Sequence, residues 1–152
     1  MDYHIRSAPV SRWYLELKME GAEKPARARA PALQAVRFLH AGFVILPIVA
    51  GIDKFFRLLA SWDQYLAPRV VASLPVEAST FLMIVGVLEI AAGLLVAFNP
   101  RVGGRVLAAW LAAIIVNLLA CPGFLDVALR DFVLLLGALT LSRLAQPFEL
   151  AR

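Results

Sequence analysis

Apolar residues in this chain fall into four long runs, which are separated by short stretches rich in proline, glycine and charge. The runs cover about residues 36–59, 78–98, 102–121 and 127–144. A helix needs about 20 mostly apolar residues to cross the hydrocarbon core of a bilayer. Each run meets or approaches that length, so the pattern predicts an all-α integral membrane four-helix bundle.

The fourth run gives the weakest signal, because Arg130 and Asp131 interrupt its start. It crosses a membrane only if these two charges are paired or lie at the interface. The breaks between the runs consist of residues that end helices or form turns. They are Pro68 and Pro75, then Asn99, Pro100, Gly103 and Gly104, then Cys121, Pro122 and Gly123, with Pro147 after the last run.

Composition points the same way. Hydrophobic residues make up 61% of the 152 positions and charged residues 17%, whereas a soluble domain is about 45–50% apolar and about 25% charged. A domain of this size keeps much of its surface exposed. The excess of apolar residues therefore indicates a surface that faces lipid.

The distribution of lysine and arginine predicts the orientation. Eleven of these residues lie in the N-terminal segment, between the second and third runs, and after the fourth run. Only four lie on the opposite side: Lys54, Arg57, Arg69 and Arg130. By the positive-inside rule, both termini are cytoplasmic. We therefore expect a multi-pass protein of the bacterial inner membrane.

Residues 1–35 are predicted to form a cytoplasmic basic tail before a transmembrane domain at 36–152. Trp13 and Tyr14 favour a short interfacial helix or a docking segment for a partner. Residues 25–31 are expected to form a basic linker. The alternative is a disordered tail attracted to anionic lipid. The net charge of +4 arises mainly beside apolar runs, which argues against nucleic-acid binding.

Ionisable groups inside a membrane span are costly, so they usually face the interior of a bundle. We expect most of them here to share one depth near the outer face, with Asp53 or Asp131 paired with Lys54 or Arg130. Glu89 lies deeper. The predicted intramembrane polar layer comprises Asp53, Lys54, Glu89, Asn117, Arg130 and Asp131.

Glu89 shares a helix face with Gly86, Gly93 and Ala97. Small residues allow a second helix to approach closely, so Glu89 is expected to face another helix. Two interpretations remain open. Either the polar residues form a network that fixes helix register, or they form a site for a polar headgroup, a quinone or a proton, in which Glu89 titrates. Some of them could also simply lie at the interface.

The loop after the first run contains apolar residues at helical spacing, from Leu58 to Leu66. This spacing predicts a short amphipathic helix on the outer surface. Its Trp62, Asp63 and Tyr65 form either an aromatic belt at the interface or a contact surface, as a lid or for another subunit.

No motif indicates catalysis. The sequence contains no Ser/His/Asp set, no metal-binding cluster and no phosphate-binding loop. His40 lacks a suitable second histidine for haem, since the other is His4 in the tail. Cys121 is the sole cysteine and is expected to be a small buried apolar residue. No cofactor is firmly predicted, although a quinone is possible.

The order of features resembles the DoxX-like family of small four-helix bacterial membrane proteins. The resemblance rests on Gly51-Ile52-Asp53-Lys54-Phe55, Glu89 followed by Gly93, and Arg130-Asp131 followed by Gly137. It covers about residues 36–144. Members are similar to the membrane subunit of a thiosulfate:quinone oxidoreductase. The resemblance implies that Lys54 ends the motif of the first helix and that Glu89 belongs to that of the second.

Three functions follow as hypotheses. The first is an auxiliary or anchoring subunit of a membrane-bound, quinone-linked electron-transfer complex, without catalytic activity of its own. The second is a quinone-interacting oxidoreductase subunit with an intramembrane acidic site. The third is an oligomeric small-solute transporter. The expected partners are membrane lipids and other subunits of a membrane complex.

Overall fold

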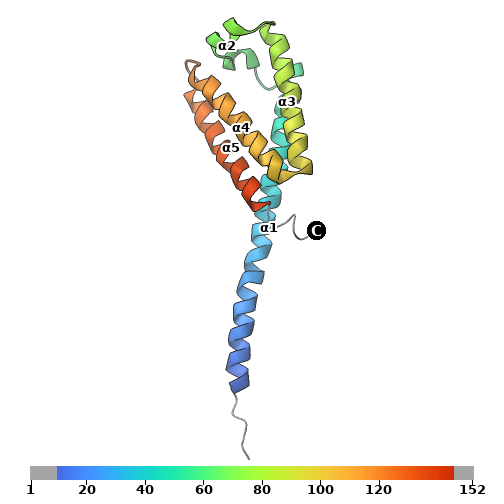
Figure 1. The fold of residues 1–152 in the computed structure, drawn as a ribbon, viewed down its shortest axis with the longest axis vertical. Coiled ribbons are helices and arrows are strands. Elements are labelled where there is room, and N and C mark those ends of the chain that lie inside the picture. The colour runs from blue at the N-terminus through green and yellow to red at the C-terminus, as the bar shows by residue number, and fades with distance from the viewer. Residues whose placement is uncertain (1–9, 146–152) are drawn as a thin grey trace, which may run out of the picture. The chain divides into compact units, whose positions relative to one another are not determined.

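The computed structural model describes the backbone of residues 10–145 and the side chains of residues 31–145. Within this range every regular element is helical (Figure 1), which confirms the predicted all-α class. The long helices are α1 (Val10–Phe56), α3 (Ala78–Phe98), α4 (Pro100–Leu119) and α5 (Leu125–Leu144). A 3-10 turn, η1 (Trp62–Tyr65), and a short helix, α2 (Pro68–Ser73), lie between α1 and α3.

Three helical segments are long and apolar enough to cross a membrane: Pro31–Phe56 of α1, and the whole of α3 and of α4. Helix α5 is 20 residues long, like α4, but its charges keep it outside this group. The fourth span therefore stays a prediction. The charged residues of α5 are Asp126, Arg130, Asp131 and Arg143.

The chain divides into two compact units, Met1–Ala35 and Val36–Arg152. In the first unit the described residues are helical, including segment 25–31, for which a basic linker was expected. Alanine and arginine, which dominate that segment, have high helix propensities. Trp13 and Tyr14 belong to this helix, but their side chains lie outside the described residues, as does all of His4.

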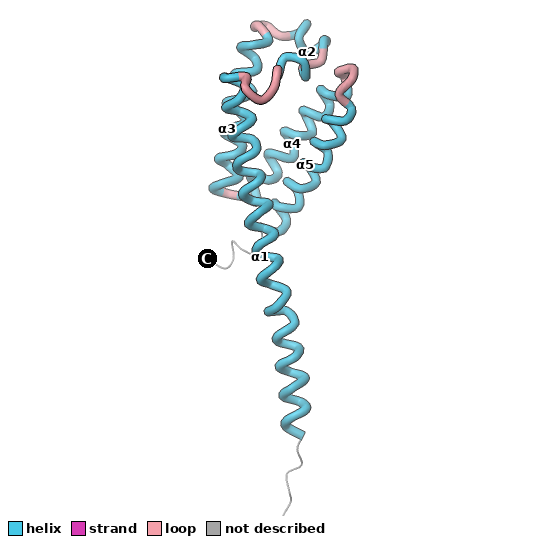
Figure 2. Tube along the Cα trace, turned by 180° about the vertical axis from the view of Figure 1, so that it is seen from behind, coloured by secondary structure: helices cyan, strands magenta, loops and turns pink. Residues whose placement is uncertain are grey.

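In the second unit, loop 57–77 and the turn between α4 and α5 lie at one end of the bundle (Figure 2), and the turn between α3 and α4 lies at the other. The helices therefore run alternately up and down. Asn99 begins α4, because its side-chain oxygen accepts the backbone N–H of Val102 at 3.0 Å. Pro100 follows at the first helical position, which suits its fixed φ.

Glycines bring the helices together in pairs. A Cβ added to Gly51 of α1 would lie 2.5 Å from the carbonyl oxygen of Gly86 in α3. One added to Gly104 of α4 would lie 2.8 Å from the carbonyl oxygen of Ala138 in α5. Any side chain at these positions would separate the backbones. Helix α1 therefore packs tightly on α3, and α4 packs tightly on α5.

The outer loop differs from the predicted amphipathic helix over 58–66. Helix α1 ends at Phe56, and Arg57 adopts a left-handed φ of 56°. Leu58 is 84% exposed, while Trp62 and Tyr65 turn inward and are partly buried. Only Trp62–Tyr65 form a 3-10 turn, and before it the Asp53 side chain accepts the backbone N–H groups of Leu58 and Leu59 where the chain leaves α1.

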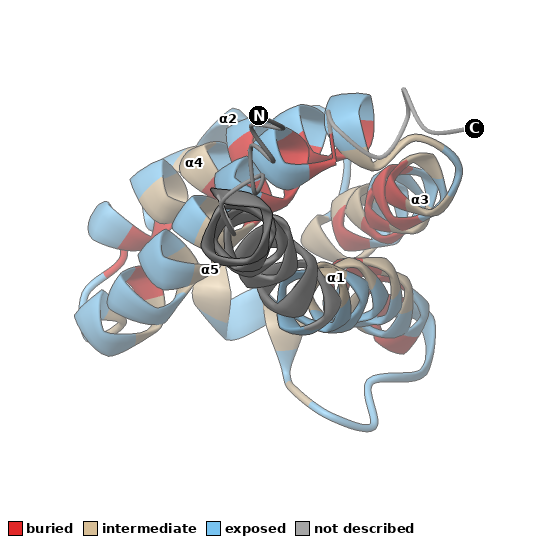
Figure 3. Cartoon of the chain, turned by 90° about the horizontal axis from the view of Figure 1, so that it is seen from below, coloured by how far each residue is buried: buried red, intermediate tan, exposed pale blue. Residues whose placement is uncertain are grey.

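Buried residues occupy the inner sides of the helices and exposed residues the outer sides (Figure 3). The core contains Phe43, Val96, Leu107 and Leu141. Many large apolar side chains point outward instead, as is typical of a surface that contacts lipid or another protein. On α5 they include Leu129, Phe132, Val133, Leu136 and Leu139.

Candidate functional site

A buried ion pair joins α1 to α3. The Lys54 ammonium lies 2.5 Å from Glu89 Oε2, and the two side chains are only 4% and 8% exposed. The prediction that Glu89 faces another helix is confirmed. The expected pairing of Lys54 with an aspartate is wrong, because the contact between Gly51 and Gly86 brings α1 within reach of Glu89.

An aromatic ring covers the free side of this ammonium group. Lys54 Nζ lies 3.7 Å from the centroid of a ring of Trp62, within the range of a cation–π interaction. The Nζ atom also approaches the carbonyl oxygen of Ala50, at 3.5 Å. The positive charge is therefore matched by one carboxylate and one aromatic face, and both come from elements other than α1.

Asp53 binds the outer loop and pairs with no cation among the described side chains. Its Oδ1 accepts the backbone N–H groups of Leu58 and Leu59 at 2.8 and 2.9 Å, and its Oδ2 accepts the indole N–H of Trp62 at 2.8 Å. These three bonds position the Trp62 ring over Lys54. Asp53 thus supports the buried pair through Trp62, and it does not line the cavity described below.

Asn117 attaches the same loop to α4. Its amide nitrogen donates to the carbonyl oxygen of Tyr65 at 2.6 Å, and its oxygen accepts the backbone N–H of Ala67 at 3.0 Å. Cys121 is buried beside this point, as expected, with its sulfur 3.5 Å from the carbonyl oxygen of Gln64. Asp63, by contrast, is on the surface, 3.1 Å from Arg57.

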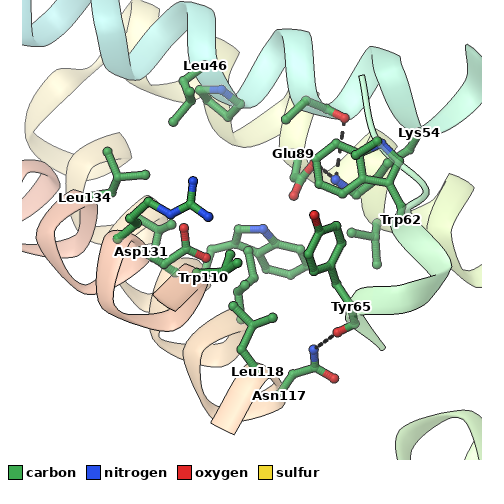
Figure 4. A pocket seen from close by; sticks show the side chains of 18 of the residues that line it. Leu46, Lys54, Trp62, Tyr65, Glu89, Trp110, Asn117, Leu118, Asp131 and Leu134 are labelled. Carbon is green, nitrogen blue, oxygen red and sulfur yellow. Dashed lines mark hydrogen bonds and ion pairs between the residues drawn. The ribbon is translucent and has the colours of Figure 1, made fainter. Parts of the chain in front are cut away.

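A cavity of about 410 Å³ lies inside the bundle (Figure 4). Helices α1, α3, α4 and α5 and the turn η1 all contribute to its walls, which are mostly apolar. This volume is within the range of small-molecule sites, about 300–1,000 Å³. Five of the six residues predicted for the polar layer line it: Lys54, Glu89, Asn117, Arg130 and Asp131.

The charges on α5 are arranged differently from the prediction. Arg130 lies 3.3 Å from Asp126, one helical turn earlier, and both side chains are more than two-thirds exposed. The expected pairing of Arg130 with Asp53 or Asp131 is therefore wrong, because Asp126 is the nearest carboxylate along the same helix face. Asp131 is partly buried and faces the cavity together with Trp110 (Figure 4).

Trp110 was not among the predicted site residues. Its indole nitrogen is buried and has no hydrogen-bond partner among the described residues, although a buried Trp N–H usually has one. In Figure 4 the indole lies in the middle of the cavity, between Asp131 and Tyr65. The sequence did contain a signal for this residue. Trp110 lies halfway along the third apolar run, whereas tryptophan in membrane proteins favours the interfaces.

His40 has a structural role at the other end of the bundle. Its Nε2 lies 2.9 Å from the carbonyl oxygen of Val96, which ties α1 to α3 below the cavity. In comparisons with known proteins, no family model, no curated protein and no solved structure matches this chain. The site itself therefore carries the functional argument.

Proposed function

We propose that this chain is a four-helix membrane protein in which α5 is the fourth span. The 20 residues of α5 would cover about 30 Å at 1.5 Å per residue, the thickness of a hydrocarbon core. Its charged residues lie in its first two turns and its last turn. Between them, Phe132, Val133 and Leu136 are exposed and apolar. This distribution supports a span in which Asp126, Arg130 and Arg143 lie near the interfaces and Asp131 faces the cavity.

We propose further that the protein is an auxiliary subunit of a quinone-linked electron-transfer complex in the bacterial inner membrane, with both termini cytoplasmic. Its role would be to hold a quinone within the bilayer. The observation that carries this proposal is the cavity. It is apolar along most of its wall and offers a few polar groups to a headgroup, as small-molecule sites generally do.

The charges on the wall of the cavity support an uncharged occupant. Lys54 and Glu89 neutralise each other as a buried pair, and the exposed Arg130 pairs with Asp126 at the surface, so neither cation of the wall is left for a charged ligand. A charged ligand would leave an excess charge in a low-dielectric site, which is costly. Lys54 and Glu89 are also among the residues on which the DoxX-like resemblance rests, and they are the two that form the buried pair.

Purification in a mild detergent tests this proposal. We expect a quinone and at least one further membrane protein to co-purify with the intact chain, identified by mass spectrometry of the lipid extract and of the protein. The quinone retained should fall in an Ala50→Leu variant, because Ala50 lines the cavity and the added side chain fills part of it.

Ala91→Leu is the matched control, since Ala91 is exposed on α3 and does not line the cavity. It should retain quinone like the wild type. A wild-type protein that migrates alone and carries no quinone would contradict the proposed function.

A further inference from the structure

A second hollow adjoins the cavity on the outer surface of the bundle. It measures about 360 Å³ and is formed entirely by α1 and α5. Every residue that lines it is apolar or glycine. Three of them, Phe43, Leu46 and Leu134, also line the cavity. Only side chains therefore separate the interior of the bundle from this outer groove.

The seam between α1 and α5 is held by apolar contacts alone. Among the described side chains, no hydrogen bond or ion pair joins the two helices. At one end of the seam the ring of Phe43 packs against Gly137. Next to it, Leu46 of α1 and Leu134 of α5 line both hollows, and Leu46 is 48% exposed. No polar bond among the described side chains would have to break for α1 and α5 to part at these two leucines.

The groove is open at Gly42. A Cβ added there would meet no atom within 4 Å, and the neighbouring Phe38 is 78% exposed. The groove thus has space for an alkyl chain lying along the outside of the bundle. If the helices span the bilayer, this face of α1 and α5 contacts lipid.

We infer that the seam between α1 and α5 is a lateral entrance from the bilayer for an uncharged amphiphile with a single chain. Its headgroup lies in the cavity and accepts a hydrogen bond from the unpartnered indole N–H of Trp110. Its chain leaves between Leu46 and Leu134 and lies in the groove at Gly42. This inference rests on the proposed function and adds the route of entry and the part of the ligand that each hollow receives.

The test uses the full-length protein in nanodiscs of synthetic phosphatidylcholine that contain no quinone. The probes are a ubiquinone with a ten-carbon chain and the same ring without a chain. Binding is followed by quenching of tryptophan fluorescence, since Trp62 and Trp110 line the cavity. We expect the chain-bearing probe to bind more tightly to the wild type.

Gly42→Leu should reduce affinity for the chain-bearing probe about tenfold, equivalent to about two methylene groups removed from apolar contact. It should leave the chainless ring unaffected. Ala41→Leu is the control, because Ala41 is exposed but does not line the groove, and it should change neither affinity. Unchanged binding of the chain-bearing probe by Gly42→Leu would overturn the lateral route while leaving the proposed function intact.

Trp110→Phe should weaken binding of both probes to a similar degree, measured as probe retained on the nanodiscs, because the donor contacts the head and not the chain. Retention equal to the wild type would refute the role of Trp110. If the wild type binds neither probe, the proposed function fails, and the lateral entrance fails with it.

Discussion

At the scale of single residues, the buried Lys54–Glu89 ion pair joins α1 to α3. Burying either charge alone costs several kcal/mol. The two charges are tolerated because the ammonium group meets a carboxylate on one side and the Trp62 ring on another. Such a pair is a weak source of stability, but loss of one partner leaves the other unpaired.

Glu89→Gln should therefore lower the free energy of unfolding by about 3–5 kcal/mol, since Lys54 then remains buried without a counter-charge. The double variant Lys54→Met, Glu89→Leu should recover most of that loss. Heating in detergent with a thiol-reactive dye follows both changes as shifts of the melting temperature. The dye reports unfolding because Cys121 is the sole cysteine and is buried.

The control for this pair is Asp63→Asn, whose partner Arg57 is about half exposed. It should change stability by at most about 1 kcal/mol. A double variant no more stable than the single one would contradict the assignment of Lys54 and Glu89 as one buried pair.

Asp53→Ala should loosen the outer loop rather than the whole bundle. It removes the acceptor for Leu58, Leu59 and Trp62, so amide hydrogen exchange at Leu58 and Leu59 should become faster. Trp62→Phe removes only the indole bond and should leave these two amides protected. Equal exchange in the wild type and Asp53→Ala would mean that this carboxylate does not hold the loop.

At the scale of helices, three close approaches and one looser seam define the bundle. Helix α1 meets α3 at Gly51 and Gly86, α3 meets α4 at Gly103, and α4 meets α5 at Gly104. The seam between α1 and α5 has no polar bond among the described residues and borders both hollows. The glycine contacts fix each helix against its neighbour along the chain, whereas α1 and α5 are held together by apolar side chains alone.

Gly86→Ala should destabilise the protein clearly, because the new Cβ would lie 2.6 Å from the carbonyl oxygen of Gly51 and push α1 from α3. Gly42→Ala is the matched control. Its Cβ meets nothing within 4 Å, so it should be neutral or stabilise the helix by up to about 1 kcal/mol. Equal melting temperatures for the two variants in detergent would contradict the close approach of α1 and α3.

At the scale of the whole molecule, the status of α5 decides the topology. Three helical segments have the length and hydropathy of spans, and with α5 as a fourth the two termini share one side of the membrane. With α5 lying on the surface, they would be on opposite sides. The exposed apolar residues along the middle of α5 favour the first arrangement.

A C-terminal fusion to green fluorescent protein should be fluorescent in cells, since that reporter matures in the cytoplasm and not after export in unfolded form. In a Cys121→Ser background, Ser61→Cys should react with a membrane-impermeant maleimide added to intact cells. Asn99→Cys, in the turn at the opposite end of the bundle, should react only after lysis. A dark C-terminal fusion would mean that α5 does not cross the membrane.

The sequence by itself determined the long helices of residues 36–144, because long apolar runs and their proline and glycine breaks depend only on local chain properties. The predicted range 78–98 coincides with α3. The sequence also indicated that one region contains Lys54, Glu89, Asn117, Arg130 and Asp131, since polar groups inside apolar runs turn away from lipid.

Only the tertiary structure decided which of these residues meet. Lys54 pairs with Glu89 and not with an aspartate because glycines bring α1 onto α3, a distance that no local pattern encodes. The fold of the outer loop depends on Asp53, which lies before the loop begins. The unpartnered Trp110 and the seam between α1 and α5 emerge from packing, because a cavity is a property of several helices together.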